Sequence, residues 1–260
     1  MIVKETAKYF ILIEQHYHAE ISGELANKWR KDYFLGADKR GSVELAIRMH
    51  DWCWQKLDKK PVFLTKEKQP ASFTDYPLNE KIVAYTEGIE FMKERDEYAA
   101  LLISSHYSSF FNGKSGKKET KFRTEEEGRQ NELKQKLGVE NHAMKEFQFH
   151  FDLLQLCDNL SLYLCMNKWG ASKDEEISWF RKGFPQKFTP LNNEKLYGEW
   201  ESEGKVILEP FPFSMQTVDV TIPYKKISKG EHTSESLLEE YQNTEYTYQD
   251  IKIQPKINFT

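Results

Sequence analysis

The sequence predicts a mainly α fold, a helical bundle joined by short antiparallel β segments from the N- and C-terminal regions. Apolar residues recur at three- and four-residue spacing through most of residues 15–167, whereas Ile- and Val-rich runs lie near the two ends. A chain of 260 residues can bury one sizeable core. We therefore expect a single domain over residues 1–260, with a helical core at 15–180 and β-containing segments at 1–14 and 185–260.

Periodicity and capping residues locate the helices. Asp96 is suited to cap one helix, the Thr124 to Glu127 stretch matches a capping box, and Gly138 is a stop signal. A second capping box at Ser172 to Glu175 predicts a short helix. The longer helices are expected over Gln15 to Arg30, from a Gly41-Ser42 cap to a stop at Lys59-Lys60-Pro61, over 79–93 and 96–111, from Thr124 to Gly138, and over 141–167.

Strands are expected at both ends of the chain. Residues 2–13 alternate loosely and are rich in Ile, Val, Tyr and Phe, as in a strand or hairpin. The most strand-like C-terminal segments are 206–208, 218–222 and 251–253, and the two ends can share one small antiparallel sheet. The polar stretch Asn112 to Lys121 is predicted to be a mobile surface loop, with a lid as the alternative.

Charge and composition exclude several classes of protein. The formal net charge of -4 gives no overall attraction to nucleic acid or to an anionic membrane. No window of about 18 apolar residues occurs, and Lys4, Glu5 and Lys8 interrupt the stretch where a signal peptide needs its apolar run. The three cysteines lack metal-type Cys-x-x-Cys spacing and are typical of reduced thiols. We expect a cytoplasmic protein that is neither exported nor membrane-spanning and binds no nucleic acid.

Histidines and aspartates carry the strongest chemical signal. His18, the adjacent pair His50-Asp51 and Asp158 lie on three separate predicted helices, and His106 lies on a fourth. Neutral imidazole nitrogen and carboxylate oxygen together suit a hard or borderline divalent ion. Asp158 stands among leucines, where an unpaired carboxylate would cost several kcal/mol. It therefore needs a cation or hydrogen bonds as partners, and either a metal ion or an arginine would satisfy it.

The order of these residues resembles the HD superfamily of metal-dependent phosphohydrolases, whose pattern is one His, an adjacent His-Asp and a distant Asp on separate helices. Four stretches are together similar to an uncharacterised bacterial family associated with that superfamily: QHYHA at 15–19, IRMHDWCW at 47–54, LLISSHY at 101–107 and LLQLCDNLSLYLC at 153–165. This likeness spans most of the chain. It implies an HD-type helical bundle.

The resemblance also implies roles for individual residues. Asp51 and Asp158 are expected to be catalytic, since either could orient the attacking water. His106 matches the additional histidine of binuclear members, either as a ligand of a second ion or as a catalytic contact to phosphate. Trp52 stands where many members have a basic residue, so a lysine or arginine from elsewhere must meet the phosphate. The implied ligands of one divalent transition metal (Mn, Fe, Co, Ni or Zn) are His18, His50, Asp51 and Asp158.

Other residues near this set favour structural roles. His16 points about 200° away from His18 around a helix, which suits a supporting group rather than a ligand. His150 lies about 12 Å along its helix from Asp158, too far to share an ion. Four aromatic residues could form a wall that stacks on a base or sugar, although core packing is favoured for each: Trp29, Trp52, Trp54 and Tyr107.

The leading function is hydrolysis of a small-molecule phosphate ester, such as a nucleotide, by a metal-dependent phosphatase or phosphodiesterase. Two alternatives stay open. Binuclear iron members of the same superfamily use O2 for oxygenation, and a metal-containing bundle can also serve as a non-catalytic metal-binding or sensor protein.

Overall fold

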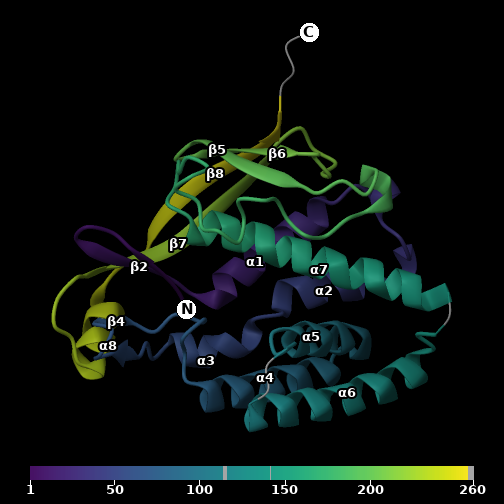
Figure 1. Ribbon diagram of the computed structural model, residues 1–260, viewed down its shortest axis with the longest axis horizontal. Helices are drawn as coiled ribbons and strands as arrows, with labels where there is room; N and C mark the ends of the chain where they lie inside the picture. Colours follow the sequence, from purple (N-terminus) through teal and green to yellow (C-terminus); the bar gives the residue numbers. More distant parts are fainter. Residues whose placement is uncertain (114–115, 141, 257–260) are drawn as a thin grey trace.

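A layer of helices packs against one six-stranded β-sheet in the computed structural model, which describes residues 1–113, 116–140 and 142–256 (Figure 1). The helices in chain order are α1 (Gln15–Lys28), α2 (Arg40–Met49), α3 (Gln55–Asp58), α4 (Leu78–Lys93), α5 (Glu97–Ser109), α6 (Lys117–Leu137), α7 (His142–Met166) and α8 (Ser234–Asn243). Helix α1 contacts both α7 and strand β7 (Val218–Ser228), which joins the two layers.

The large sheet has the strand order β1-β2-β7-β8-β6-β5. Every neighbouring pair is antiparallel except β6 and β8, which are parallel. A separate two-stranded sheet joins β3 (Phe63–Leu64) to β4 (Gln69–Pro70). The other strands of the large sheet are β1 (Ile2–Glu5), β2 (Tyr9–Ile13), β5 (Tyr197–Ser202), β6 (Lys205–Glu209) and β8 (Thr247–Pro255).

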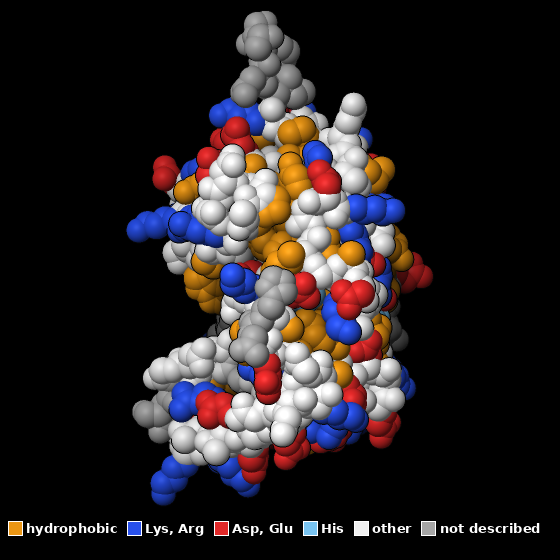
Figure 2. Space-filling view, turned by 90° about the vertical axis from the view of Figure 1, so that its right-hand side faces the viewer, with side chains coloured by type: hydrophobic (Ala, Val, Ile, Leu, Met, Phe, Trp, Pro, Cys, Tyr) orange, Lys and Arg blue, Asp and Glu red, His pale blue; other side chains and the backbone are white. Residues whose placement is uncertain are grey.

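Helices α1, α2, α5 and α7 form the centre of the helical layer, and α4 and α6 cover α5 on its outer side (Figure 1). Leu25, Ile47, Leu102 and Leu154 are fully buried on the four central helices. Across the described ranges, no helix combines the length and the apolarity that a membrane crossing requires. On the face shown in Figure 2, basic and acidic side chains are interspersed, in keeping with the small net charge.

The prediction of a mainly α fold, an all-α bundle, is wrong. About 49% of the chain is helical, and the six-stranded mixed sheet makes the fold α/β. The runs 218–222 and 251–253 are strands as predicted, but β7 and β8 extend to 11 and 9 residues. The extension of β7 carries Pro223, Lys225 and Lys226, residue types that are depleted in strands, so local propensity underestimates its length. Pairing of β7 with both β2 and β8 stabilises it instead.

Most predicted helices are present, with differences at their ends. Asp96 caps α5 as predicted and accepts a hydrogen bond from Ala99 N at 2.9 Å. Gly138 ends α6 with a φ of 65°. Helix α6 begins at Lys117, however, so Thr124 lies inside it and the predicted capping box is wrong. Long polar side chains such as Lys, Glu and Gln are good helix formers, which explains why this polar stretch is helical.

The predicted surface loop at 112–121 is therefore shorter than expected. Residues 117–121 belong to α6, and residues 114–115 lie outside the described residues. The predicted short helix from Ser172 is a turn, in which the Glu175 side chain accepts from Ser172 N at 3.0 Å. Half of a capping box thus forms without a helix after it. Helix α8 was not predicted; Thr233 and Ser236 form its capping box.

Helix α1 approaches α2 very closely at Gly23, where an added Cβ atom would lie 2.6 Å from Arg48 Cβ. We expect Gly23→Ala to destabilise the protein by about 1–2 kcal/mol, because overpacking outweighs the gain in helix propensity. Denaturant unfolding measures the change. Gly128→Ala in α6 is the matched control: no described atom lies within 4 Å of its Cβ, so it should stabilise by about 1 kcal/mol. Equal effects of the two variants would contradict the close contact.

Lys4 of β1 is buried beside the end of α7. Its Nζ donates to Asn167 O at 3.1 Å and lies 3.4 Å from the ring centroid of Trp169. Burial lowers the pKa of Lys4 from 10.5 to about 7. Between these two pH values the unfolded chain binds more protons than the folded chain. The free energy of unfolding should therefore rise with pH across this window.

Replacing Lys4 with methionine removes this pH dependence. We expect Lys4→Met to have a higher free energy of unfolding than the wild type. The difference between the two proteins should be about 2 kcal/mol larger at pH 6 than at pH 9. Urea unfolding at both pH values measures it. Lys56→Met is the control, since Lys56 is 81% exposed and its removal should have the same small effect at each pH. A Lys4→Met effect that does not change with pH would disprove the prediction.

Candidate metal centre

The five residues expected at a metal site converge among the central helices. α1 contributes His18, the end of α2 contributes His50 and Asp51, α5 contributes His106, and α7 contributes Asp158. His18 Nε2 lies 3.1 Å from Asp51 Oδ2 and 3.2 Å from His50 Nε2. Asp158 Oδ1 lies 3.5 Å from Nε2 of both histidines. Asp158 Oδ2 lies 3.5 Å from His106 Nε2, so one carboxylate links all three imidazoles.

A break in the helix directs His50 and Asp51 to the same point. Helix α2 ends at Met49, and Asp51 has φ -108° and ψ 21° before the 3-10 helix Trp52–Trp54. In an unbroken helix, adjacent side chains diverge by about 100°. The continuous helix predicted to run to Lys59 is therefore wrong, and the break is what allows both side chains to face one centre. The Tyr107 hydroxyl of α5 donates to His50 O and fastens the break to the bundle.

Hydrogen bonds behind the cluster orient two of its imidazoles. His50 Nδ1 lies 2.7 Å from Ile47 O, and because a carbonyl only accepts, Nδ1 carries a proton there. His18 Nδ1 lies 2.5 Å from Ser161 Oγ, which donates its own proton to Asp158 O. In their neutral forms both imidazoles therefore present the lone pair of Nε2 to the centre. This is the tautomer that a metal ligand requires.

The spacing and the donor types fit a divalent metal ion. Ligand atoms about 2.1 Å from a tetrahedral ion lie about 3.4 Å from one another. The distances from Nε2 of His18 and His50 to the nearest carboxylate oxygens of Asp51 and Asp158 are 3.1 to 3.7 Å. A second group, His50, His106 and Asp158, has ligand atoms within 4.8 Å of one another. The mixture of imidazole and carboxylate suits Mn, Fe, Co, Ni or Zn.

Burial and charge act against each other in the cluster. Burial alone would lower the pKa of His50, but the carboxylates of Asp51 and Asp158 outweigh it and raise that pKa to about 9. Burial alone would raise the pKa of Asp158, whereas the hydrogen bond from His50 and the charge of His106 lower it to about 2. For His106 burial prevails and lowers the pKa to about 4. Two buried carboxylates at this point thus need a nearby positive charge.

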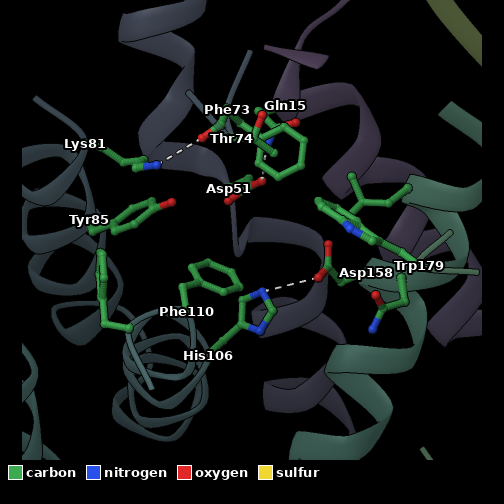
Figure 3. A pocket seen from close by; sticks show the side chains of 13 residues that line it. Gln15, Asp51, Phe73, Thr74, Lys81, Tyr85, His106, Phe110, Asp158 and Trp179 are labelled. Atoms are coloured by element: carbon green, nitrogen blue, oxygen red, sulfur yellow. Dashed lines mark hydrogen bonds and ion pairs between the residues drawn. The ribbon is translucent and has the colours of Figure 1, made fainter. Parts of the chain in front are cut away.

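A cavity of about 410 Å³ opens on one side of the cluster. Asp51, His106 and Asp158 line it, while His18 and His50 are 1% exposed and lie behind them. Figure 3 shows the side chains of Asp51, His106 and Asp158 directed toward this space. Catalytic metal sites keep an open position, whereas structural ones are closed by protein ligands on every side. The arrangement is therefore that of a site with access for a small molecule.

Comparison with known proteins gives a family. A family model described as "Protein of unknown function (DUF3891)" matches residues 1–229. The chain belongs to the DUF3891 family. The match includes all five residues of the cluster and ends before α8. No curated protein and no solved structure matches the chain significantly. The expected likeness to an uncharacterised family is confirmed, and nothing in these comparisons links DUF3891 to the HD superfamily.

Sequence reasoning missed several polar residues that line the cavity, among them Gln15 and Lys81. Gln15 donates from Nε2 to Asp51 Oδ2 at 2.9 Å, and its buried Oε1 has no hydrogen-bond partner among the described residues. Its place three residues before His18, on the same helix face, could have indicated it. Lys81 lines the cavity and donates to Phe73 O at 3.0 Å. No local motif marks Lys81, which is brought to the site only by the packing of α4.

The predicted aromatic wall is built from other residues than expected. Among the described lining residues, none of the four candidate aromatics is present. Trp52 stacks on Phe91, and Trp29, Trp54 and Tyr107 are buried in the core. Core packing, the favoured interpretation, thus holds for the three buried ones. The aromatic residues that do line the cavity are Phe73, Tyr85, Phe110, Phe111 and Trp179.

The two histidines excluded as ligands have other partners. His16 Nε2 lies 3.1 Å from Glu20 Oε1, and His16 Nδ1 accepts a hydrogen bond from Gln55 Nε2 on the outer side of α1. His150 is buried between the Tyr98 hydroxyl and Leu35 O, each at 2.7 Å from one ring nitrogen. Both histidines therefore support the fold around the cluster rather than joining it.

Proposed function

We propose that this chain is a metal-dependent phosphohydrolase in which His18, His50, Asp51 and Asp158 hold a divalent transition metal. The observation that carries the proposal is the convergence of two imidazoles and two carboxylates beside an open cavity. The resemblance of the ordered residues to the HD superfamily supports the reaction type. A small-molecule phosphate ester is the proposed substrate.

A divalent ion at such a site lowers the pKa of water toward neutrality and polarises a phosphoryl oxygen. The residues of the chain supply the rest. Asp51 and Asp158 face the cavity, where their oxygens accept hydrogen bonds from water and fix its direction. His106, kept neutral at pH 7 by burial, is placed to contact the phosphate. Lys81 brings positive charge to the cavity and replaces the basic residue absent after the His-Asp pair.

Hydrolysis of p-nitrophenyl phosphate and its bis-p-nitrophenyl diester tests the proposal. We expect slow turnover with Mn or Co that a chelator abolishes and added metal restores. Asp51→Asn should remove the activity. Asp152→Asn should keep it, because Asp152 lies on α7 with Asp158 but does not line this cavity. Activity unchanged by both chelation and Asp51→Asn would rule out the mechanism.

Gln15 is expected to position Asp51 and the attacking water. Its Nε2 holds Asp51 Oδ2, and its Oε1 is a buried acceptor at the cavity. We expect Gln15→Leu to lower kcat about tenfold while KM and metal content stay unchanged. Steady-state kinetics with parallel metal analysis measures both. Gln55→Leu is the control, since Gln55 contacts His16 outside the cavity. A fall in metal content as large as the fall in kcat would assign Gln15 to metal binding instead.

Oxygenation by a binuclear iron centre, as in binuclear iron members of the HD superfamily, is a second candidate. The observation that favours it is the second ligand group, in which Asp158 turns one oxygen toward His50 and the other toward His106. Elemental analysis of the purified protein separates the two. About two iron ions per chain would favour oxygenation, and about one manganese or cobalt ion would favour hydrolysis.

A further inference from the structure

Aromatic rings surround the cavity on the sides away from the metal centre. Tyr85 is buried, whereas Phe110 and Trp179 are 38% and 56% exposed and so lie toward the opening. Figure 3 shows Tyr85 and Trp179 on opposite sides of the space, with Asp51 between them. Rigid aromatic faces offer a large apolar contact area to a flat ligand at little entropic cost. The walls therefore favour a ring system over a flexible polar chain.

Trp179 is held in place although its own ring is exposed. The next residue, Phe180, is 3% exposed and packs on Tyr163 with ring centroids 5.6 Å apart. Phe180 thus anchors the turn, and Trp179 extends from it to the cavity. A large exposed aromatic beside a concave site is typical of a ligand contact.

The charges around the cavity suit a single phosphate. Asp51 and Asp158 offset the two positive charges of a divalent ion. Lys81 is the only lysine or arginine among the described residues that line the cavity. A monoester phosphate carries about two negative charges at neutral pH. Further phosphates would add negative charge for which this lining supplies no second cation.

The size of the cavity limits the rest of the ligand. Its volume of about 410 Å³ lies in the lower part of the roughly 300–1,000 Å³ range of small-molecule sites. We infer that the site selects phosphomonoesters in which one phosphate is joined to a flat, uncharged ring system. The phosphate lies between the metal centre and Lys81, and the ring lies against Trp179. This inference rests on the proposed function and adds the class of leaving group to it.

The reaction that follows is ordinary ester hydrolysis. The oxygen of water forms a bond to phosphorus, the ester P–O bond breaks, and the leaving oxygen takes a proton. The products are the free ring alcohol and inorganic phosphate. No oxidant, reductant or further reactant is required.

Binding of phosphonates, whose C–P bond resists hydrolysis, tests the inference apart from turnover. With the Mn-loaded protein, calorimetry should show naphthalen-1-ylphosphonate binding about 30-fold more tightly than methylphosphonate, because only the former buries a ring. AMP and ADP carry the same sugar and base and differ by one phosphate, so ADP should compete with the naphthyl probe no better than AMP. Equal affinity for the two phosphonates, or ADP binding more tightly than AMP, would overturn the inference.

Matched variants locate the contacts. Trp179→Ala should weaken binding of the naphthyl compound about tenfold and leave binding of methylphosphonate unchanged. Tyr248→Ala, at a comparably exposed aromatic residue on β8, should change neither affinity. Lys81→Met should weaken both phosphonates equally, and Lys56→Met neither. Unchanged naphthyl binding by Trp179→Ala would refute the ring contact. If the naphthyl phosphonate binds in a Trp179-dependent way but 1-naphthyl phosphate is not hydrolysed, the inference holds and the proposed function is wrong. If 1-naphthyl phosphate is hydrolysed but the two phosphonates bind equally well, the proposed function holds and the inference is wrong.

Discussion

Asp51→Ala is expected to lower the metal content of the purified protein at least tenfold. The wild-type protein should carry about 0.5 equivalents or more of a transition metal per chain. The variant loses one of four donors and one of the two carboxylate charges that neutralise the ion. His50→Ala should have an effect of the same size, because its Nε2 lies within 3.7 Å of both aspartates. Elemental analysis after purification without chelators measures the metal directly.

Two further variants separate loss of metal from loss of fold. Asp51→Asn keeps the shape of the side chain and an acceptor for Gln15 Nε2, so it should fold normally by circular dichroism and still lose metal. Asp152→Asn should retain full metal. If Asp51→Ala and His50→Ala both keep the wild-type metal content, the cluster is not a metal site.

The contrast between local and distant contacts explains how much of the fold could be predicted. Helices α1, α5 and α7 depend on neighbours three and four residues away, and their spacing is visible in the sequence. The sheet depends on pairs such as Tyr9 with Ser228, which are distant in the chain. β2 pairs antiparallel with β7, as expected of two chain ends that share a sheet, but no local pattern records that the sheet has six strands or that β6 runs parallel to β8. The sheet was therefore underestimated, although the expected strand segments at 2–13, 206–208, 218–222 and 251–253 all coincide with its strands.

For the candidate site too, the residues could be predicted from the sequence but their spatial arrangement could not. His18, His50, Asp51, His106 and Asp158 could be chosen because metal chemistry limits the residue types and the helical setting places each side chain inward. The geometry that brings them together could not be predicted from the sequence, because it depends on the break in the helix after Met49 and on the close approach of α1 to α2 at Gly23. The cavity wall was also hidden. Lys81 and Trp179 come from elements whose packing around the centre is not encoded by a local motif.

Replacing His106 with alanine is expected to lower kcat/KM for phosphate ester hydrolysis roughly 100-fold while the first metal ion remains bound. His106 is 2% exposed, lines the cavity, and has a buried Nδ1 without a partner among the described residues. Its Nε2 lies 3.5 Å from Asp158 Oδ2, at the long end of an ion-pair contact. The imidazole therefore lies where a ligand bound in the cavity would contact it.

Metal analysis and a second substitution decide which ligand this is. If His106 binds a second ion, His106→Ala should reduce the metal content from about two ions to about one, and His106→Gln should not restore activity. If it contacts the phosphate, metal content should stay constant, KM should rise, and His106→Gln should recover about tenfold by supplying a new hydrogen-bond donor. His16→Ala, at a histidine outside the cavity, is the control. Unchanged kinetics and unchanged metal content in His106→Ala would exclude both roles.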